Sequence, residues 1–206
     1  MFIEYEKLIV NKRKYTKTKR AELQKQTRER IVEAVVALHE ELGPANTSIK
    51  AVAERAGVQR LTVYRYFPDN FSLFQACSSH WLSLNPPPNV IDWATIQKAN
   101  EQTYAALLAF YKYYRRTEPM WTRIYRDVED IEALRKSMEE FEAYLDQVCD
   151  VIMKNWRIRG KREQQISLTL RHSLSFATWR SLKHEKLEDI QIVELVMSWV
   201  HAAKTL

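Results

Sequence analysis

Apolar residues recur at intervals of three and four along most of the chain, which predicts helices throughout. In residues 28–42 they include Ile31, Val35 and Leu38, the spacing of one helix face. Gly43, followed by a proline, ends this helix, because glycine adopts the left-handed conformation after a helix and proline cannot continue one. The first third of the chain therefore begins with an amphipathic helix.

Two short helices are predicted within residues 47–67. Thr47 or Ser48 can cap the first helix through a side-chain hydroxyl, and Gly57 ends it after about eight residues. The second helix runs from Arg60 to Phe67. A capped helix, a glycine turn and a second short helix form the pattern of a helix-turn-helix.

The second helix of this pair offers side chains suited to DNA. Val58 and Val63 wedge the two helices together, and the remaining positions can face solvent. Hydrogen-bonding and cationic groups there suit phosphates and base edges. These residues are Gln59, Arg60, Thr62, Tyr64, Arg65 and Tyr66.

Three prolines at residues 86–88 mark the clearest break in the chain. Only helices are predicted beyond it: 92–116, a second from Thr117 with Pro119 in its first turn, and a long helix from residue 130 that Gly160 ends. The long helix carries a seam of strict 3-4 spacing, made by Ile131, Leu134, Met138, Phe141, Leu145, Val148 and Ile152.

The last two predicted helices, 161–183 and 188–204, are apolar on more than one side. A helix at the end of a monomeric chain normally leaves one polar face in contact with solvent. One apolar face of these helices is therefore expected to pack against the core, and the other against a partner subunit. The alternative is a fully buried central helix. The candidate interface residues are Ile166, Leu170, Leu174, Val193, Val196, Met197 and Val200.

Composition excludes the common nucleotide-binding enzymes. The 206 residues include three glycines, too few and too scattered for a dinucleotide-binding fingerprint or a phosphate-binding loop. No nucleophile–base pair or metal-ligand spacing stands out, so neither enzyme activity nor a cofactor or metal is expected. Two cysteines, Cys77 and Cys149, fit buried reduced thiols. Without a signal-peptide core or an apolar span, the chain is expected to be cytoplasmic and not membrane-bound.

The net charge of +6 is confined to the first third of the chain. Residues 1–65 hold 14 Lys/Arg and 8 Asp/Glu, whereas residues 66–206 hold 18 of each. Residues 11–30 alone contain nine Lys/Arg and two Glu, which predicts a mobile basic arm running into the first helix. This arm can add DNA-backbone or minor-groove contacts, or it can be a solvated charge run. All six tryptophans lie after residue 80.

Residues 31–74 resemble the DNA-binding domain of the TetR/AcrR family of bacterial repressors. The resemblance rests on positions matched in register over about 45 residues. They are Ile31-Val32, Ala34, Leu38, Glu40, Gly43, Thr47-Ser48-Ile49, Val52-Ala53, Ala56-Gly57-Val58, Thr62, Val63-Tyr64, Tyr66-Phe67 and Leu73. The resemblance implies an all-α fold of about nine helices, with a three-helix DNA-binding domain and a larger helical ligand-binding and dimerisation domain.

The resemblance also implies roles for single residues. Ser48 and Lys50 are placed to touch phosphates or a groove edge, Arg60 and Thr62 to contact bases, and Tyr64 and Tyr66, with the chemically suited Arg65, to contact phosphates. The chain departs from the family at Gln59, where a small capping serine is usual, so that the cap is weaker and the glutamine can contact DNA instead. It also departs at Asn70, where lysine is usual, although the asparagine can still hydrogen-bond phosphate. His39 replaces a usual aromatic residue and is expected to fill that slot as a partly buried ring.

On this resemblance the expected domains are a basic arm (1–26), a helix-turn-helix domain with a connecting helix (27–85) and an effector-binding and dimerisation domain (86–206). The expected function is a homodimeric repressor released from a palindromic operator in double-stranded DNA by a small-molecule effector. The alternative is an all-helical enzyme or adaptor whose basic end binds RNA, a membrane or an acidic protein. Aromatic residues that can line an effector pocket are Tyr104, Phe110, Trp121, Tyr125, Phe141, Tyr144, Phe176 and Trp179.

Overall fold

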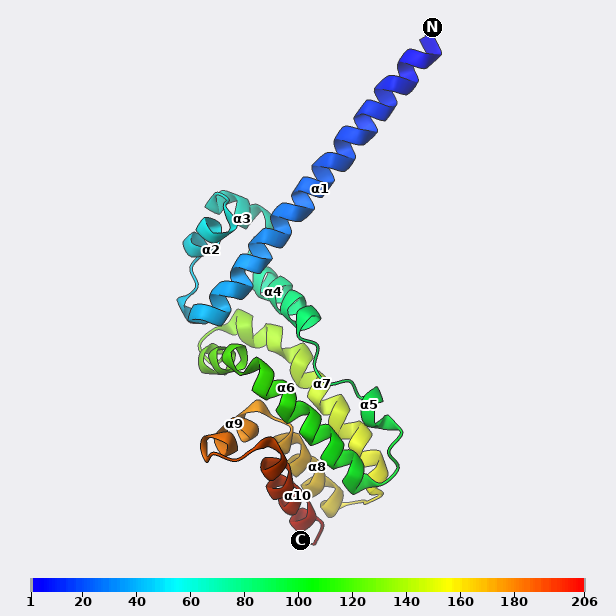
Figure 1. Cartoon of the computed structure of the whole chain (residues 1–206), viewed down its shortest axis with the longest axis vertical. Helices are drawn as coiled ribbons and strands as arrows, with labels where there is room; N and C mark the ends of the chain where they lie inside the picture. The colour runs from blue at the N-terminus through cyan, green and yellow to red at the C-terminus, as the bar shows by residue number, and fades with distance from the viewer. Residues whose placement is uncertain (1, 206) are drawn as a thin grey trace. The chain divides into compact units, whose positions relative to one another are not determined.

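The computed structural model describes the backbone of residues 2–205 and the side chains of residues 18–204. All regular structure in this part of the chain is helical, with ten α-helices and one 3-10 turn (Figure 1). The predicted all-α class is therefore confirmed. The chain divides into two compact units between Trp81 and Leu82, upstream of the proline run at which the sequence places a domain boundary.

The N-terminal unit is built on a long first helix. The helix predicted for 28–42 is the last part of this helix, which begins at Phe2. The basic segment at residues 11–30 is therefore helical, where the sequence predicted a mobile arm. The elements in chain order are α1 (Phe2–Leu42), the 3-10 turn η1 (Pro44–Asn46), α2 (Ile49–Ala56), α3 (Arg60–Tyr66) and the start of α4 (Asn70–Leu84).

A small apolar core holds these helices together. Helix α1 packs against α2, and α2 packs against α3. The residues at the centre of the core are Ile31, Val35, Leu38, Val52, Val63, Phe67 and Cys77, each at most 4% exposed. Leu42 and Leu61 are apolar but lie outside this core, at 43% and 77% exposure. The short helices therefore keep a narrow inner face and leave most of α3 at the surface.

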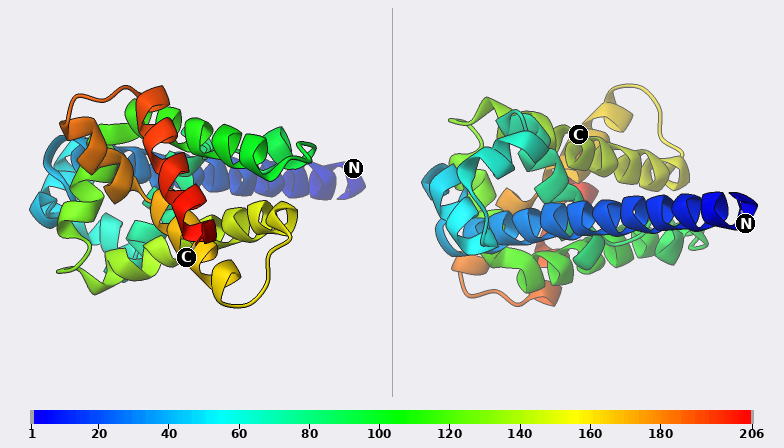
Figure 2. Two further views of the ribbon diagram at one scale, coloured as in Figure 1. Left: turned by 90° about the horizontal axis from the view of Figure 1, so that it is seen from below. Right: turned by 90° about the horizontal axis from the view of Figure 1, so that it is seen from above.

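The C-terminal unit contains the remaining six helices. Helix α6 packs against α7 and α10, and α8 packs against the same two helices (Figure 2). The bounds are α5 (Ile91–Ala94), α6 (Ala99–Asp127), α7 (Glu132–Trp156), α8 (Lys161–Ser173), α9 (Phe176–His184) and α10 (Asp189–Thr205).

The helix break predicted at Thr117 lies elsewhere in this unit. Thr117 was expected to cap a new helix, but its hydroxyl donates to the carbonyl of Tyr113 at 2.6 Å and α6 continues past Pro119. The break falls before α6 instead, at residues 95–98. Thr117, Met120 and Trp121 are buried, so core packing offsets the backbone hydrogen bond that proline cannot donate.

The predicted helix 161–183 is divided into α8 and α9. Ser175 begins α9 by accepting a hydrogen bond from the backbone N–H of Thr178 at 3.2 Å. The hydroxyl of Thr178 in turn donates to the carbonyl of His172 at 2.7 Å. This paired capping stabilises a bend that the apolar spacing alone does not indicate.

The seam of the long helix α7 is confirmed from Leu134 to Ile152, where all six residues are at most 7% exposed. The helix ends at Trp156, and Arg157 adopts the left-handed conformation with φ 50°. Gly160 therefore does not end this helix; it precedes α8 with φ 72°. Within the described residues, none of the helices combines the length and apolar character that crossing a bilayer requires.

Candidate nucleic-acid interface

Helix α2 begins at a serine whose side chain is both a cap and a surface group. The Ser48 hydroxyl oxygen accepts the backbone N–H of Ala51 at 3.1 Å, and the residue is exposed. Its O–H remains a donor suited to a phosphate oxygen. Lys50 lies in the first turn, 3.8 Å from Glu54 through two side chains that are each about two-thirds exposed. Such an exposed pair is weak, so the ammonium can exchange Glu54 for phosphate.

The turn between α2 and α3 requires a glycine. Gly57 adopts φ 64° and ψ 41°, a left-handed conformation that costs free energy for any residue with a Cβ. The N–H of Val58 donates to the carbonyl of Ala53 at 2.9 Å. This closed turn sets the angle at which α3 leaves α2, as the sequence predicts.

Helix α3 presents one face to its own core and the other to solvent. Val63 and Phe67 are 0% and 3% exposed. At 100° per residue, the opposite face is centred on Leu61 and Arg65, with Tyr64 beside Leu61, whereas Arg60 lies in the first turn on the side towards Phe67. All of these side chains except that of Phe67 are exposed.

Leu61 is a surface residue that sequence reasoning missed. At 77% exposure it is the most exposed of the large apolar side chains that the structure describes. An isopropyl group on this face suits contact with a thymine methyl in the major groove. The signal was available, because the i,i+4 pair Val63 and Phe67 fixes the inner face and leaves position 61 opposite it.

Gln59 stands at the start of α3 without capping it. Its backbone is extended, and its side chain makes no capping hydrogen bond. The backbone carbonyl of Gln59 accepts the N–H of Thr62 at 2.8 Å. The side-chain amide is exposed and can pair with a base edge or a phosphate, which matches the weak cap that the sequence predicts. Thr62 is half-buried.

Two aromatic side chains flank this face. Tyr64 is 52% exposed, whereas Tyr66 is half-buried and lies under the guanidinium of Arg65, 5.4 Å from its ring centroid. Tyr66 also lines a hollow of about 540 Å³ between α1 and α4, together with Arg28 and His80. The sequence-predicted tyrosines therefore differ, with one projecting freely and one packed beside a cation.

Helix α4 begins where the family usually has a lysine. Asp69 accepts the backbone N–H of Ser72 at 2.7 Å, and this hydrogen bond holds the pKa of the Asp69 carboxyl below its ordinary value. Asn70 follows at the surface. A capping carboxylate beside the predicted Asn70 contact repels phosphate, a feature that sequence reasoning missed.

Arg55 is a cation of this region that pairs with a carboxylate of the same chain. Its guanidinium donates to both carboxylate oxygens of Glu41 on α1, at 2.6 and 2.7 Å. These hydrogen bonds lower the pKa of Glu41. The pair ties α2 to α1 and fixes the platform from which α3 projects.

The ring of His39 occupies the position in α1 at which the sequence predicts a buried ring. His39 is 5% exposed and stacks on Phe74, with 5.3 Å between ring centroids. Its Nδ1 lies 3.5 Å from the sulfur of Cys77, and burial raises the pKa of that thiol to about 12. This side of α1 is therefore structural.

Seven of the eight predicted pocket residues belong to one aromatic cluster in the C-terminal unit. Trp121 lies at its centre, 4.5 Å from Phe141 and 6.3 Å from Phe176 between ring centroids. Tyr114, which is not among the predicted pocket residues, joins Phe110 to this group, with 6.0 Å between ring centroids. The remaining members reach the cluster through ring contacts of 5.4 to 6.4 Å; they are Tyr125, Tyr144 and Trp179. The rings pack on one another as a core.

Tyr104, the eighth predicted residue, lies apart from this cluster. It lines a surface hollow of about 510 Å³ between α6 and α10 with Met197, Glu194 and His201. The structure therefore does not bring the eight predicted residues together around one space.

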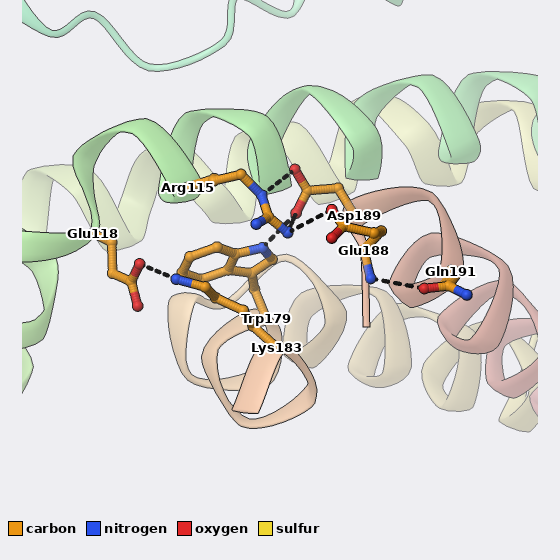
Figure 3. Close-up of polar contacts among 7 residues, drawn as sticks. All are labelled: Arg115, Glu118, Trp179, Lys183, Glu188, Asp189 and Gln191. Atoms are coloured by element: carbon orange, nitrogen blue, oxygen red, sulfur yellow. Dashed lines mark hydrogen bonds and ion pairs between the residues drawn. The ribbon is translucent and has the colours of Figure 1, made fainter. Parts of the chain in front are cut away.

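A polar network holds α9 and the start of α10 against α6 (Figure 3). The guanidinium of Arg115 donates to both oxygens of Asp189, each at 2.9 Å, and the indole N–H of Trp179 donates to the same carboxylate at 3.0 Å. Lys183 pairs with Glu118 one turn along α6. The pKa of the Asp189 carboxyl is below its ordinary value, because burial, which acts to raise it, is outweighed by the hydrogen bonds from Arg115 and Trp179.

The seven predicted interface residues lie inside the C-terminal unit. Six of them are 0% exposed and Met197 is 8% exposed, and they are buried within the same chain, where α8 and α10 pack on each other, α8 on α7 and α10 on α6. The prediction that these residues face a partner subunit is therefore wrong. The apolar residues left at the surface of these helices include Leu168, Ile190 and Leu195, at 64%, 52% and 38% exposure.

Comparison with known proteins points to one family. Residues 31–77 match the sequence model described as bacterial regulatory proteins, tetR family. Comparison with curated protein sequences finds no match. Among solved structures, a protein from Mesorhizobium loti MAFF303099 assigned as a TetR-family transcriptional regulator is similar at 15% identity and TM-score 0.60, covering 88% of this chain and 96% of its own.

Two further structures show the same likeness. A TetR-like transcriptional regulator from Rhodococcus sp. RHA1 has 16% identity and TM-score 0.58, over 84% of this chain and 93% of its own. A protein from Clostridium perfringens assigned as a fatty acid metabolism regulator has 15% identity and TM-score 0.57, over 83% and 96%. At these identities the likeness concerns the fold, which extends through both units.

Proposed function

We propose that this chain is a DNA-binding transcriptional regulator of the TetR family, whose sequence model its residues 31–77 match, and that it acts as a homodimeric repressor released from a palindromic operator by a small molecule. The observation that carries the proposal is the outer face of α3. It presents a phenol and an isopropyl group from Tyr64 and Leu61, with the exposed guanidinium of Arg60 in the first turn, on a helix that Val63 anchors in the core.

Arg60 is the proposed base reader. It lies at the first residue of α3, where a side chain reaches deepest when the N-terminus of a recognition helix enters the major groove. A guanidinium there can donate two hydrogen bonds to guanine O6 and N7. Leu61 and Thr62 add apolar and hydroxyl contacts, while Ser48, Lys50 and Tyr64 contact phosphates.

The proposed two-fold symmetry of the dimer explains why the operator is proposed to be palindromic. The exposed apolar residues Leu168, Ile190 and Leu195 are the proposed contacts across a two-fold axis, because the inner stripes of α8 and α10 are already buried in the subunit. Two copies of α3 related by such an axis enter successive major grooves, roughly one helical turn apart. The operator is therefore proposed to be an inverted repeat.

Release by an effector requires the C-terminal unit to change. The aromatic cluster around Trp121 is closely packed, so a ligand that binds among these rings separates them and shifts the neighbouring helices. A ligand that prefers the non-binding conformation by about 1–3 kcal/mol weakens DNA binding roughly 5- to 150-fold. Tyr125, whose hydroxyl bonds Glu142 at 3.0 Å, is the proposed polar edge of this site.

The proposal is tested by capturing fragments of host genomic DNA on the purified protein. The expected result is recovery of one inverted repeat upstream of a gene, and lower transcription from that promoter when the protein is added. Arg60→Ala is expected to lose this fragment, while Arg162→Ala, an exposed arginine of α8, keeps it. Recovery of fragments without a shared sequence rejects the proposal.

A further inference from the structure

The indole N–H of Trp93 is a buried hydrogen-bond donor without an acceptor. Trp93 lies in α5 and is 1% exposed, and its Nε1 has no hydrogen-bond partner among the residues that the structure describes. Proteins leave few buried N–H groups unpaired, because such a group has lost its contact with water and gained no acceptor in exchange. This donor is therefore one that the fold itself does not use.

Two other buried indoles of the same unit do find an oxygen. The N–H of Trp156 donates to the hydroxyl of Thr103 at 3.1 Å, and that of Trp179 donates to the carboxylate of Asp189 at 3.0 Å. A buried tryptophan usually has such a partner for its N–H. Burial of an indole therefore does not by itself leave the N–H unpaired in this fold, and Trp93 differs from these two residues.

Trp93 lies at the edge of the aromatic cluster. Its ring centroid is 6.2 Å from that of Phe110. The ring of Phe110 is in turn 6.0 Å from that of Tyr114 and 6.4 Å from that of Tyr144. Phe110 and Tyr114 are both fully buried. The unpaired donor therefore adjoins the rings among which the effector is proposed to bind.

Hydrogen bonds from α6 and α7 fix the backbone around Trp93. The side-chain amide of Gln102 donates to the carbonyl of Trp93 at 3.2 Å, and that of Asn155 donates to the carbonyl of Ile96 at 2.9 Å. Gln102 is itself 1% exposed, and its side-chain oxygen accepts a hydrogen bond from Asn155 at 3.0 Å. These contacts hold the indole in place, but none of them accepts its N–H.

The groups around Trp93 favour an uncharged ligand with an acceptor oxygen. An indole N–H only donates, so it complements a carbonyl or ether oxygen and cannot pair with an ammonium group. Burial raises the pKa of the Tyr144 hydroxyl, and the carboxylate of Asp92 in α5 raises it further. This negative charge disfavours an anionic ligand, whereas the rings of Phe110 and Tyr114 suit a ligand with an apolar body.

We propose that Trp93 determines the specificity of the effector site, and that its N–H binds a carbonyl or ether oxygen of an uncharged, ring-bearing effector. The inference rests on the proposed function, because it places the donor at the edge of the proposed effector site. The ring of the ligand packs against Phe110 while its oxygen accepts the N–H. Since this N–H is already out of water, the hydrogen bond forms without the cost of desolvating the donor. The site therefore prefers a ligand with the oxygen over one of the same shape without it.

The test uses the full chain and two planar probes of the same shape, acetophenone and α-methylstyrene, which differ only in carrying a carbonyl or a methylidene group. The tryptophan indoles are isotopically labelled at nitrogen, and binding is followed by NMR. The signal of Trp93 is the one that is missing from the spectrum of Trp93→Phe. The matched control is Trp156→Phe, which removes a buried indole of the same unit whose N–H is already paired.

The wild type is expected to bind acetophenone about tenfold more tightly than α-methylstyrene, as one well-placed hydrogen bond allows, with a downfield shift of the Trp93 indole proton. Trp93→Phe is expected to bind the two probes within about twofold of each other, since it has no N–H to donate. Trp156→Phe is expected to keep the preference. The same preference in Trp93→Phe, its loss in both variants, the absence of the downfield shift, or no binding of acetophenone to the wild type overturns the inference.

Thermal melting supplies a second readout that needs no ligand. Both substitutions remove part of a buried ring, but Trp156→Phe also removes a hydrogen bond. Trp93→Phe is therefore expected to lower the Tm less than Trp156→Phe does. A larger fall for Trp93→Phe shows that the fold uses the Trp93 N–H, and overturns the inference.

Failure of the proposed function is distinguishable from failure of this inference. If the wild-type chain selects no preferred DNA sequence, the repressor proposal fails, while the comparison of the two probes still decides whether Trp93 binds a ligand oxygen. If the chain selects an inverted repeat but Trp93→Phe distinguishes the probes as the wild type does, only this inference fails.

Discussion

The two units of this protein use their side chains in opposite ways. In the N-terminal unit the candidate functional groups project outward from a small aliphatic core, as Arg60 and Tyr64 do beside buried Val63. In the C-terminal unit the candidate functional groups are the core itself, since Trp121 and Phe176 are 2% and 1% exposed. The proposed DNA-binding surface is already exposed, whereas the proposed effector site needs the buried rings to separate.

Because of this difference, substitutions at the candidate site of the N-terminal unit should change binding without changing stability, whereas those in the C-terminal unit should change both. On the proposed function, replacing an exposed group of α3 removes a contact with DNA and leaves the core intact. Replacing a ring of the aromatic cluster changes both the packing and any space for an effector. Mutations in the two units should therefore give different combinations of unfolding free energy and affinity.

The largest expected effect is on stability of the C-terminal unit. Trp121→Ala removes a buried ring that contacts five other aromatic rings and should lower the free energy of unfolding by about 3–5 kcal/mol. Urea unfolding followed by circular dichroism measures the change. A loss below about 1 kcal/mol would mean that the cluster is already loose, and the contrast between the units would break.

The next effect is on DNA affinity without a change in stability. Arg60→Ala should weaken binding to the preferred sequence by about 1–3 kcal/mol and relax the base preference at one position. The unfolding free energy should stay within about 0.5 kcal/mol, because the side chain is exposed. Anisotropy on matched and single-mismatch duplexes, with a melt of the free protein, gives both numbers. A comparable loss of stability would contradict the division of roles.

A third prediction concerns the polar network of Figure 3. Asp189→Asn weakens the hydrogen bonds from Arg115 and Trp179 and should cost about 1–2 kcal/mol. Because the pKa of Asp189 in the folded chain is below its ordinary value of 3.8, its contribution is present at neutral pH and fades as the pH falls through 3.8 and below. Denaturation at pH 7 and pH 3 should show a smaller gap between wild type and variant at pH 3. A gap independent of pH would contradict the role of the ionised carboxylate.

The smallest expected effect separates two roles of Ser48. Ser48→Ala removes the cap of α2 and should cost about 1 kcal/mol of stability. Ser48→Asp keeps a capping oxygen and should retain stability, but its negative charge should weaken DNA binding more than alanine does. Thermal melts and anisotropy of the two variants compare the roles. Equal DNA affinities would show that position 48 lies away from phosphate.

The helix-turn-helix was predictable from sequence because its determinants are local. The Ser48 cap, the left-handed Gly57 and the i,i+4 pair of Val63 and Phe67 each act within a few residues. The exposure of Leu61 has a related cause. A seven-residue helix has a narrow inner face, which that pair already fills.

The C-terminal unit was less predictable because its determinants are distant in sequence. Helix α6 continues past Pro119 because residues around it pack against other helices. The stripe through Leu170 and Val196 was assigned to a partner, but it is buried by the chain's own helices. Whether apolar rings form a core or line a space also depends on side-chain packing, which apolar spacing does not encode.

The most direct test of the central claim is selection from a library of random duplexes by the wild-type chain and by Arg60→Ala. The wild type is expected to enrich one inverted repeat, with half-sites about one helical turn apart or a multiple of it. Arg60→Ala is expected to lose the preference at one base pair of each half-site. Enrichment of no sequence by the wild type, or the same repeat with unchanged preference from Arg60→Ala, would contradict the claim that α3 reads DNA through this arginine.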